Sequence, residues 1–253
     1  MLHQSSLTEL FVLRYHGSTF VADKENSWAV YSVCFSGDYL PLLNSLKHDD
    51  IVLDLGANIG CFSILAAKRS RLVYSVEPNP DTFKLLVSNI NRNNASNVIP
   101  LNVAVAGADG VSFLSGHGLE AHLSSEGTPV RKITLDQVCD AQANAIKMDI
   151  EGTEIEALRG GQRTLHRSRV ILLESHVNTA CVFELLRAHS FRVRTFCASN
   201  QSKMRGVMSP DFLFYEFMSG WLGARSRLAL AEAKLGRRST YRTQFSMVFG
   251  VKS

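Results

Sequence analysis

The sequence predicts an α/β fold in which a seven-stranded, mostly parallel sheet carries helices on both faces. The main observation is an alternation of short apolar runs with helix-like stretches between Ile51 and Phe217, the pattern of a parallel sheet with crossover helices. A second observation is that the first apolar run ends in a glycine-containing turn and the next one ends in an acid. Because parallel α/β sheets bind ligands where their strands end, we expect a binding site at this edge.

The apolar runs define the strands, and the stretches between them define the helices. Strands are expected at Ile51–Leu55, Leu72–Val76, Val98–Val103, Ala145–Ile150, Val170–Glu174, Phe191–Cys197 and Asp211–Met218. Helices are expected at Ile59–Lys68, Pro80–Asn91, Glu154–His166 and Asn178–His189. The stretch Val111–Val130 breaks this rhythm with its glycines and Pro129, which predicts a hairpin and a loop near the site.

The chain divides by composition into three parts. Residues 1–47 precede the first core strand and are expected to form a lid or an extra layer, and residues 48–218 form the sheet domain. Residues 219–253 form a basic extension, because seven Lys and Arg stand against one acid there. The overall formal charge of +4 is therefore local, so the charge of the sheet domain does not indicate a nucleic-acid binder.

The composition excludes several classes of protein. With 45% hydrophobic and 20% charged residues, the chain has ample material for a core, which argues against disorder or a fibre. No apolar run reaches the length of a membrane-spanning helix and the first residues do not resemble a leader, so a cytoplasmic protein is expected. The five cysteines are odd in number and contain no C-x-x-C pair, which disfavours a disulfide framework or a zinc cage.

The segment VLDLGANIG, Val52 to Gly60, is the most informative motif. A strand ends in a turn with Gly56 and Gly60, and the helix that follows offers unpaired N–H groups to a ligand. The glycine spacing is neither the G-x-G-x-x-G of a dinucleotide fold nor a phosphate loop. The alternative interpretation is that a tight strand-to-helix turn needs these glycines for structural reasons alone.

A second motif, VEPNP, places Glu77 at the end of the next strand. An acid in this position can accept hydrogen bonds from both hydroxyls of a ribose. The alternative is a surface acid or a helix cap. Together with the glycine turn, the ribose interpretation is favoured and describes an adenosine site without a pyrophosphate clamp.

A third motif, AIKMDIEGTEIEALRGG, runs from a strand into a helix. Lys147, Asp149 and Glu151 project to one side of the strand end, and Glu154 begins the helix. Close carboxylates raise one another's pKa, and one of them can take a proton from a hydroxyl nucleophile. The alternative is that the acids only favour the helix N-terminus while Lys147 pairs with Asp149 structurally.

A fourth motif, ILLESH, ends the fifth strand in Glu174 and His176. The histidine is a candidate general base, although a lone histidine more often has a structural role. Asp149, Glu174 and His176 together could hold a divalent ion, but their spacing is not diagnostic, and no metal site is predicted.

The order of these motifs resembles the FkbM family of S-adenosylmethionine-dependent methyltransferases. The resemblance rests on VLDLGANIG, VEPNP, NVAV (Asn102–Val105), TLD (Thr134–Asp136), IKMDIEGTE and ILLESH, and it runs from about Tyr39 to His176. It implies the Rossmann-like fold of class I methyltransferases, with the last strand inserted antiparallel, and S-adenosyl-L-methionine as the cofactor. By position, it implies that the cofactor is bound by Asp54, Gly56, Asn58, Gly60, Glu77, Asn102 and Ala104.

The resemblance implies O-methylation of a hydroxyl on a sugar or small secondary metabolite. The catalytic candidates remain those of the motifs, with Asp149 expected first as the base, together with Lys147, Glu151 and His176. The [DNS]-P-P-[YF] motif common among N-methyltransferases is absent, which lowers the expectation of a nucleic-acid acceptor. Two alternatives stay open: a macromolecular acceptor, whether glycan, protein or RNA, docked by the basic extension, or a methyltransferase-like binding domain without catalysis.

Overall fold

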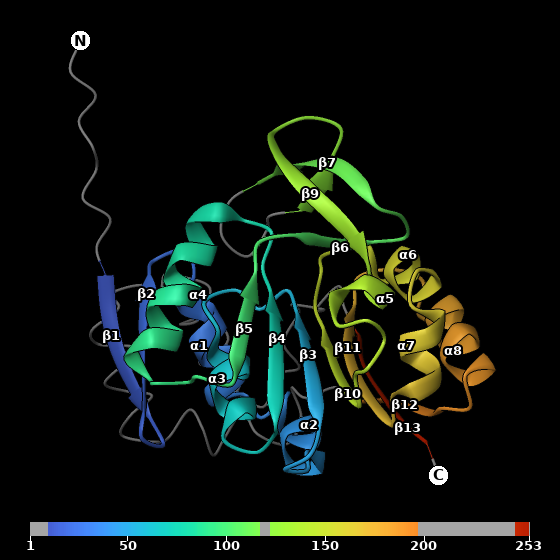
Figure 1. The fold of residues 1–253 in the computed structure, drawn as a ribbon, viewed down its shortest axis with the longest axis horizontal. Helices are drawn as coiled ribbons and strands as arrows, with labels where there is room; N and C mark the ends of the chain where they lie inside the picture. Colours follow the sequence, from blue (N-terminus) through green and yellow to red (C-terminus); the bar gives the residue numbers. More distant parts are fainter. Residues whose placement is uncertain (1–9, 117–121, 197–245, 253) are drawn as a thin grey trace, which may run out of the picture.

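The computed structural model describes residues 10–116, 122–196 and 246–252, and its centre is a seven-stranded sheet (Figure 1). The strand order is β12-β13-β11-β10-β3-β4-β5. The strands are β3 (Ile51–Leu55), β4 (Leu72–Val76), β5 (Val98–Leu101), β10 (Ala145–Met148), β11 (Val170–Ser175), β12 (Arg192–Phe196) and β13 (Ser246–Val251). Only β13 runs antiparallel to both of its neighbours. This mixed sheet confirms the mostly parallel α/β fold.

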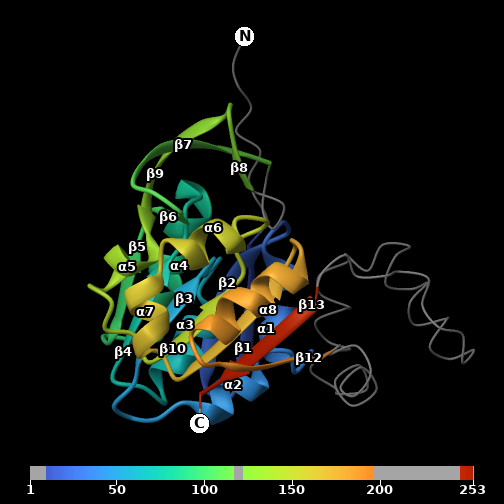
Figure 2. The same cartoon turned by 90° about the vertical axis from the view of Figure 1, so that its right-hand side faces the viewer.

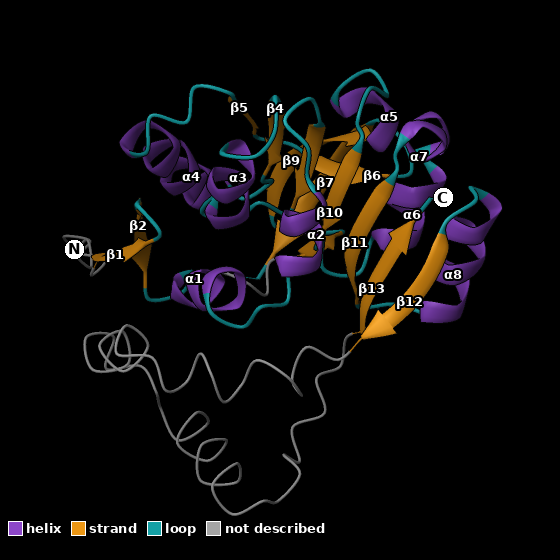
Figure 3. Ribbon diagram, turned by 90° about the horizontal axis from the view of Figure 1, so that it is seen from below, coloured by secondary structure: helices purple, strands orange, loops and turns teal. Residues whose placement is uncertain are grey.

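Apolar side chains alternate between the two faces of the sheet, as the period of a strand requires. Val170 and Leu172 of β11 belong to one buried cluster, whereas Ile171 and Leu173 belong to the other. The first cluster packs against α3 (Cys61–Ala67) and α4 (Pro80–Arg92), and the second against α5 (Leu135–Val138), α6 (Glu154–Arg159), α7 (Gln162–Arg167) and α8 (Thr179–Ala188). Figure 3 shows these two groups of helices on opposite sides of the sheet. Both faces are therefore buried, which explains why inner strands such as β11 are mostly apolar.

Helix α4 begins where the sequence predicts it, for a local reason. The side chain of Asn79 accepts hydrogen bonds from the backbone N–H groups of Asp81 and Thr82, and Pro80 occupies the first turn. An asparagine cap followed by proline is a strong start signal, because both satisfy or remove donors that the helix leaves unpaired.

The predicted helix Glu154–His166 is instead two helices, α6 and α7. They are separated by Gly160 and Gly161, which pack too closely against other segments for side chains. A Cβ on Gly161 would lie 2.4 Å from Cδ2 of Leu135, and one on Gly160 would lie 2.9 Å from the carbonyl oxygen of Ala106. The glycine pair therefore turns the chain so that both helices pack on the sheet.

The seventh strand of the sheet differs from the sequence prediction. The predicted strand Asp211–Met218 lies outside the described residues, and β13 supplies the strand between β11 and β12. Figure 2 shows β13, in red, beside β12. Residues 246–251 were assigned by charge to the basic extension, but their apolar side chains Met247, Val248 and Phe249 are buried in the sheet. Strand β13, the second strand from one edge of the sheet, therefore comes from within residues 219–253.

Residues 10–45 add a layer on the side of α3 and α4. It consists of the hairpin β1 (Leu10–Tyr15) and β2 (Ser18–Asp23), followed by α1 (Ser27–Cys34) and α2 (Leu40–Ser45). The amide of Asn89 on α4 exchanges two hydrogen bonds with the backbone of Val21, at 2.7 and 2.9 Å. Because Asn89 is fully buried, these bonds join β2 to the domain through a satisfied polar contact.

A small four-stranded sheet lies beyond the carboxyl ends of the central strands, at the top of Figure 1. Its strands are β6 (Ala104–Ala106), β7 (Gly110–Ser115), β8 (His122–Ser124) and β9 (Thr128–Thr134). The sequence predicted a hairpin near the site in this region, and β7, β8 and β9 are joined by antiparallel pairing. Within the described ranges, no helix is long and apolar enough to cross a membrane.

Candidate active site

A cleft lies at the carboxyl ends of β3, β4 and β10, beneath the small sheet. It encloses about 650 Å³ of space, including its open mouth. Four predicted cofactor residues line it, namely Gly56, Asn58, Glu77 and Ala104, together with the catalytic candidates Asp149 and Glu151. Among the described residues, the candidates Asp54, Gly60, Asn102, Lys147 and His176 are not part of its lining. The cleft thus brings together acids that the sequence separates by some seventy residues.

The glycines of the first motif are required by contacts inside the protein. Gly56 has φ +73°, and a Cβ there would lie 1.7 Å from the carbonyl oxygen of Asp149. Gly60 has φ +89°, and its Cβ would lie 2.6 Å from Cδ1 of Leu86. Both conformations favour glycine, so the structural interpretation of this motif accounts for both residues. Gly56 contributes to the cleft by letting the loops after β3 and β10 approach each other.

Glu77 is fixed at the cleft wall by two backbone donors. Its Oε2 accepts from the N–H of Asn58 at 2.9 Å, and its Oε1 accepts from the N–H of Asn79 at 2.8 Å. The residue is only 7% exposed. Burial raises the pKa of Glu77 to about 7, although both N–H groups and Lys147 oppose the shift. A carboxylate oxygen that accepts one hydrogen bond can accept another, so Glu77 is oriented and retains acceptor capacity.

Asn102 braces the loop that follows β4. Its side-chain amide donates to the carbonyl oxygens of Glu77 at 2.8 Å and Pro78 at 3.0 Å. Ala104, by contrast, lies on the cleft lining beside Val103 and Val105. The segment expected at an adenine edge therefore offers an apolar wall to the cleft, and Asn102 supports the neighbouring loop.

Lys147 and Asp54 form a buried pair behind the cleft. The Nζ of Lys147 lies 3.2 Å from Oδ1 of Asp54 and donates to the carbonyl oxygen of Gly56 at 2.6 Å. The hydroxyl of Ser63 donates to Oδ2 of Asp54. Burial disfavours the charge of Lys147, but Asp54 and Asp149 raise its pKa above the ordinary value. The lysine is therefore a cation that holds the loop after β3, which carries Gly56 and Gly60 and is called the glycine loop below.

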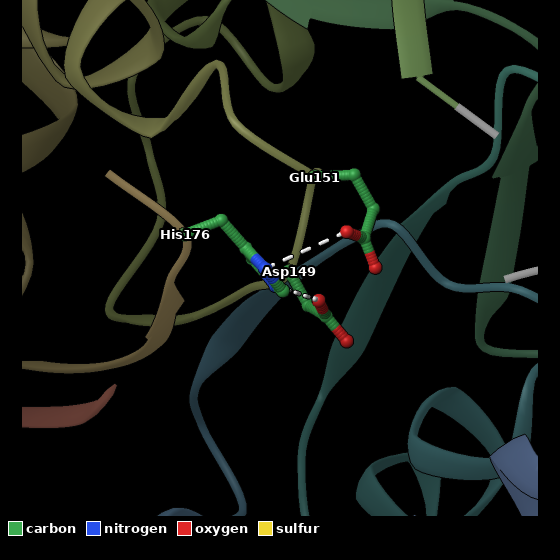
Figure 4. A group of neighbouring side chains, drawn as sticks. All are labelled: Asp149, Glu151 and His176. Atoms are coloured by element: carbon green, nitrogen blue, oxygen red, sulfur yellow. Dashed lines mark ion pairs between the residues drawn. The ribbon is translucent and has the colours of Figure 1, made fainter. Parts of the chain in front are cut away.

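Three carboxylates surround His176 and form, with it, the carboxylate–histidine cluster: Asp149, Glu151, Glu174 and His176. The Nε2 of His176 lies 3.7 Å from Oδ1 of Asp149 and 3.5 Å from Oε1 of Glu174, and its Nδ1 lies 3.6 Å from Oε2 of Glu151. Figure 4 shows the imidazole pointing toward the carboxylates of Asp149 and Glu151, with an ion pair drawn to each. Glu151 reaches this position from a backbone with φ +52°, an uncommon conformation for a residue other than glycine.

The members of the cluster differ in pKa. Burial opposes the charge of His176, but the adjacent carboxylates of Asp149, Glu174 and Glu151 raise its pKa to about 10. Burial, reinforced by the charge of Asp149, raises the pKa of both Glu151 and Glu174 to about 7. Burial would also raise the pKa of Asp149, but Lys147, His176 and Tyr39 hold it below the usual value. Glu151 therefore combines a pKa near neutrality with a place on the cleft lining.

Part of the cluster also has the spacing of a metal site. One ligand atom from each of Asp149, Glu151 and His176 lies within 4.8 Å of the others. Oxygen and imidazole ligands of this kind suit a divalent cation, although acidic groups have this spacing in many proteins without binding one.

The motifs do not identify Tyr39 as part of the site. Its hydroxyl lies 3.1 Å from Oδ2 of Asp149 and 3.4 Å from Oε2 of Glu174. A single tyrosine in a segment without a motif carries no signal that sequence analysis can read. The cleft residues Leu114, His122 and Leu123 come from the stretch that the sequence predicted to lie near the site.

Comparison with known proteins gives one family match. A family model described as the methyltransferase FkbM domain matches residues 54–201. The hexuronic acid methyltransferase AglP of Haloferax volcanii is 29% identical over 167 residues, which are 62% of this chain and 69% of that protein. A tRNA (guanine(37)-N(1))-methyltransferase of Pediculus humanus subsp. corporis is 43% identical over 58 residues, only 23% of this chain and 12% of that protein.

Solved structures show more distant likeness. The methyltransferase FkbM of Methylobacillus flagellatus has a TM-score of 0.46 at 15% identity, with 70% of this chain and 52% of that chain covered. The tRNA m1G37 methyltransferase of M. jannaschii has a TM-score of 0.49 at 13% identity, with 98% of this chain and 58% of that chain covered.

Proposed function

This chain belongs to the FkbM methyltransferase family, and from that premise we propose that it transfers a methyl group from S-adenosylmethionine to a hydroxyl of a sugar or similar small metabolite. The observation that carries the proposal is the cleft itself. It places a preoriented carboxylate, Glu77, and a carboxylate with a pKa near neutrality, Glu151, on one lining. The first is suited to hold a ribose, and the second is suited to accept a proton from a hydroxyl.

The residues of the cleft fit the proposed cofactor. Glu77 is held by two N–H groups and keeps acceptor capacity for ribose hydroxyls. Val103, Ala104 and Val105 offer an apolar surface for a purine ring beside it. The negative charge of Asp149 and Glu151 further along the lining suits the positive charge of a sulfonium. These contacts support the proposal of an adenosine end and a sulfonium end for the site.

When bound, S-adenosylmethionine supplies an electrophilic methyl group from its sulfonium. Glu151 is proposed to take the proton of the acceptor hydroxyl as the acceptor oxygen forms its bond to the methyl carbon and the bond to sulfur breaks. The products are then a methyl ether, S-adenosylhomocysteine and a protonated Glu151. Asp149 was expected first in this role, but its lowered pKa makes it the weaker base and favours Glu151.

The other predicted catalytic residues have positioning roles in this proposal. Lys147 holds the carbonyl oxygen of Gly56 and is compensated by Asp54. His176, with its pKa raised to about 10, is protonated at neutral pH and so cannot accept the proton there. It instead brings Asp149 and Glu151 close together despite their like charge.

The charge of the site favours an uncharged acceptor. A carboxylate or phosphate on the acceptor would be repelled by Asp149 and Glu151, which share the cleft lining. The Haloferax relative is named as acting on a hexuronic acid, which supports a sugar acceptor. Because a hexuronate carries a carboxylate, we expect it to be a poorer acceptor here than a neutral hexose. The tRNA-modifying relatives match only short parts of their own length, and a phosphate-rich acceptor agrees poorly with the acidic cleft.

The proposal is tested by following a radiolabelled methyl group from S-adenosylmethionine into separate acceptors: neutral hexose glycosides, hexuronate glycosides and tRNA. We expect more label in the neutral hexose glycosides than in the hexuronate glycosides, in a product that resists alkali, because a methyl ether is stable where a methyl ester hydrolyses. Label that alkali releases would show carboxyl methylation, and label in tRNA would show a nucleic-acid acceptor; either result would contradict the proposal. Cofactor binding without transfer to any acceptor would favour a binding domain.

A matched pair of variants links the chemistry to the proposed base. Glu151→Gln removes the proton acceptor, whereas Glu156→Gln changes an exposed carboxylate on α6. Transfer should fall about 10²–10⁴-fold in the first variant, the usual contribution of a general base, and stay unchanged in the second. Equal activity in both variants would remove Glu151 from the mechanism.

A further inference from the structure

Tyr39 joins the N-terminal layer to the carboxylate–histidine cluster. It precedes α2 and is only 3% exposed. Its hydroxyl donates to Oδ2 of Asp149 at 3.1 Å and lies 3.4 Å from Oε2 of Glu174. These carboxylates follow β10 and belong to β11, so one phenol spans the ends of two neighbouring strands. Tyr39 also lies outside residues 54–201, the part of the chain that the family model matches.

The ring of Tyr39 is fixed on its other sides. It packs against Phe62 of α3 with ring centroids 5.9 Å apart, and Nζ of Lys147 lies 5.6 Å from its centroid. The backbone carbonyl oxygen of Tyr39 accepts from the N–H of Leu43 in α2. A buried ring with contacts on several sides has little freedom to rotate, so its hydroxyl is held against the two carboxylates.

A continuous chain of contacts leads from this phenol to the cleft. Tyr39 contacts Oδ2 of Asp149, Oδ1 of Asp149 faces Nε2 of His176, and Nδ1 of His176 faces Glu151. Each step uses a different atom of the intermediate group. Asp149, together with Glu174, therefore constrains where the imidazole lies, and the imidazole in turn faces the carboxylate of Glu151.

We propose that Tyr39 is a positioning residue for methyl transfer, which acts by holding Asp149, and through it His176, so that Glu151 faces the acceptor. The inference rests on the proposed function of Glu151. It also means that the N-terminal layer completes the site, because the phenol comes from outside residues 54–201, which the family model matches.

The charges around Tyr39 keep it a hydrogen-bond donor. Burial raises its pKa well above the ordinary value, and the charges of Asp149, Glu174 and Asp38 act in the same direction. Asp149 in turn faces Lys147 and His176, and the bond from Tyr39 is a third influence that lowers its pKa. Removing the phenol hydroxyl should therefore raise the pKa of Asp149, whichever acceptor the enzyme uses.

The test compares the full-length chain with Tyr39→Phe and with the control Tyr15→Phe, which removes a phenol from a ring that packs on Phe35 in the same layer. For Tyr39→Phe we expect kcat to fall about tenfold, the factor that corresponds to one charge-assisted hydrogen bond of ~1.4 kcal/mol. The Kd for S-adenosylmethionine, measured by calorimetry, should stay within about twofold. The control should match the wild type in both quantities.

A second readout does not depend on activity. With ¹³C-labelled aspartate, the Cγ signal of Asp149, assigned through Asp149→Asn, should titrate at higher pH in Tyr39→Phe than in the wild type. Incorporation of 3-fluorotyrosine at position 39 gives a more acidic phenol and a stronger donor, so it should move the titration to lower pH. This variant retains the hydroxyl, so it keeps the test decisive if Tyr39→Phe does not fold.

An Asp149 titration unaffected by either change would overturn the inference, as would loss of cofactor binding together with kcat. Failure of the proposed function would give a different set of results from failure of this inference. In that case no acceptor is methylated or no cofactor binds in the wild type, whereas the titration of Asp149 still responds to position 39.

Discussion

The Nζ of Lys147 lies 3.2 Å from Oδ1 of Asp54, and the two residues face each other in the register of neighbouring parallel strands. Both side chains are buried. The same ammonium donates to the carbonyl oxygen of Gly56, so one buried ion pair fixes the exit of β3 and the start of the glycine loop. Buried pairs of this kind are costly to break, because the remaining charge stays desolvated.

Removing one member of this pair should destabilise the fold strongly. We expect Lys147→Met to lower the free energy of unfolding by about 3–5 kcal/mol, since Asp54 is then a buried charge without its cation. Lys84→Met is the control, because the pair of Lys84 with Asp81 is largely exposed and should be worth less than about 1 kcal/mol. Urea unfolding measures the free energy of unfolding of both variants. A similar small loss in the two variants would show that the buried pair does not hold the loop.

A side chain added to the glycine loop should lower the stability of the fold. Gly56→Ala places a Cβ against the backbone carbonyl of Asp149, whereas Gly17→Ala, also at positive φ, meets nothing within 4 Å. We expect a loss of about 1–2 kcal/mol for Gly17→Ala from its conformation alone and more than about 3 kcal/mol for Gly56→Ala, which adds the collision. Thermal unfolding of the protein without ligand measures the difference. A fully stable Gly56→Ala with weakened ligand binding would instead indicate a direct ligand role.

The pH dependence of transfer should report Glu151. Its pKa of about 7 means that the carboxylate is ionised above this pH and protonated below it, and only the ionised form accepts a proton. We expect kcat/KM, which reflects the free enzyme, to rise with pH through about 7 and then level off. A profile already flat from pH 5 to 8 would instead favour Asp149, whose pKa is below the usual value.

The C-terminal strand should be essential to the domain. Removal of residues 246–253 deletes β13, which pairs with both β11 and β12, and it exposes the edge of the largely apolar strand β11. We expect the shortened chain to unfold or aggregate, as circular dichroism and gel filtration would show. A folded, monomeric product would mean that the sheet does not need β13. Removal of the whole basic extension, residues 219–253, would delete this strand as well.

Much of the fold could be predicted because its signals are local. The run Ile51–Leu55 is mostly apolar and is followed by Gly56, which marks the end of a strand. Asn79 caps a helix that begins at Pro80. Both elements were therefore placed correctly. The division of residues 154–166 into two helices was missed, because it depends on the packing of Gly160 and Gly161 against Leu135 and Ala106. Such close approaches follow from tertiary contacts and leave no periodic pattern.

Only the part of the candidate site that depends on local sequence signals could be predicted. Strand ends are local features, so Glu77, Asp149 and Glu151 could be placed at one edge of the sheet and now share the cleft lining. The contact between Tyr39 and Asp149 spans more than a hundred residues and depends on how α2 docks. The different pKa values of Asp149 and Glu151 depend on burial and neighbours, which a spacing in sequence does not encode.

The central claim is that the cleft binds S-adenosylmethionine through Glu77, and calorimetric titration tests it most directly. The wild type, Glu77→Ala and the control Glu184→Gln, an exposed acid on α8, are each titrated with S-adenosylmethionine, S-adenosylhomocysteine and NAD. We predict that the wild type and the control bind the first two ligands and not NAD, and that Glu77→Ala weakens both about tenfold or more, as loss of hydrogen bonds to a charged group implies. Absence of binding by folded, ligand-free wild type, or unchanged affinity in Glu77→Ala, would contradict the account.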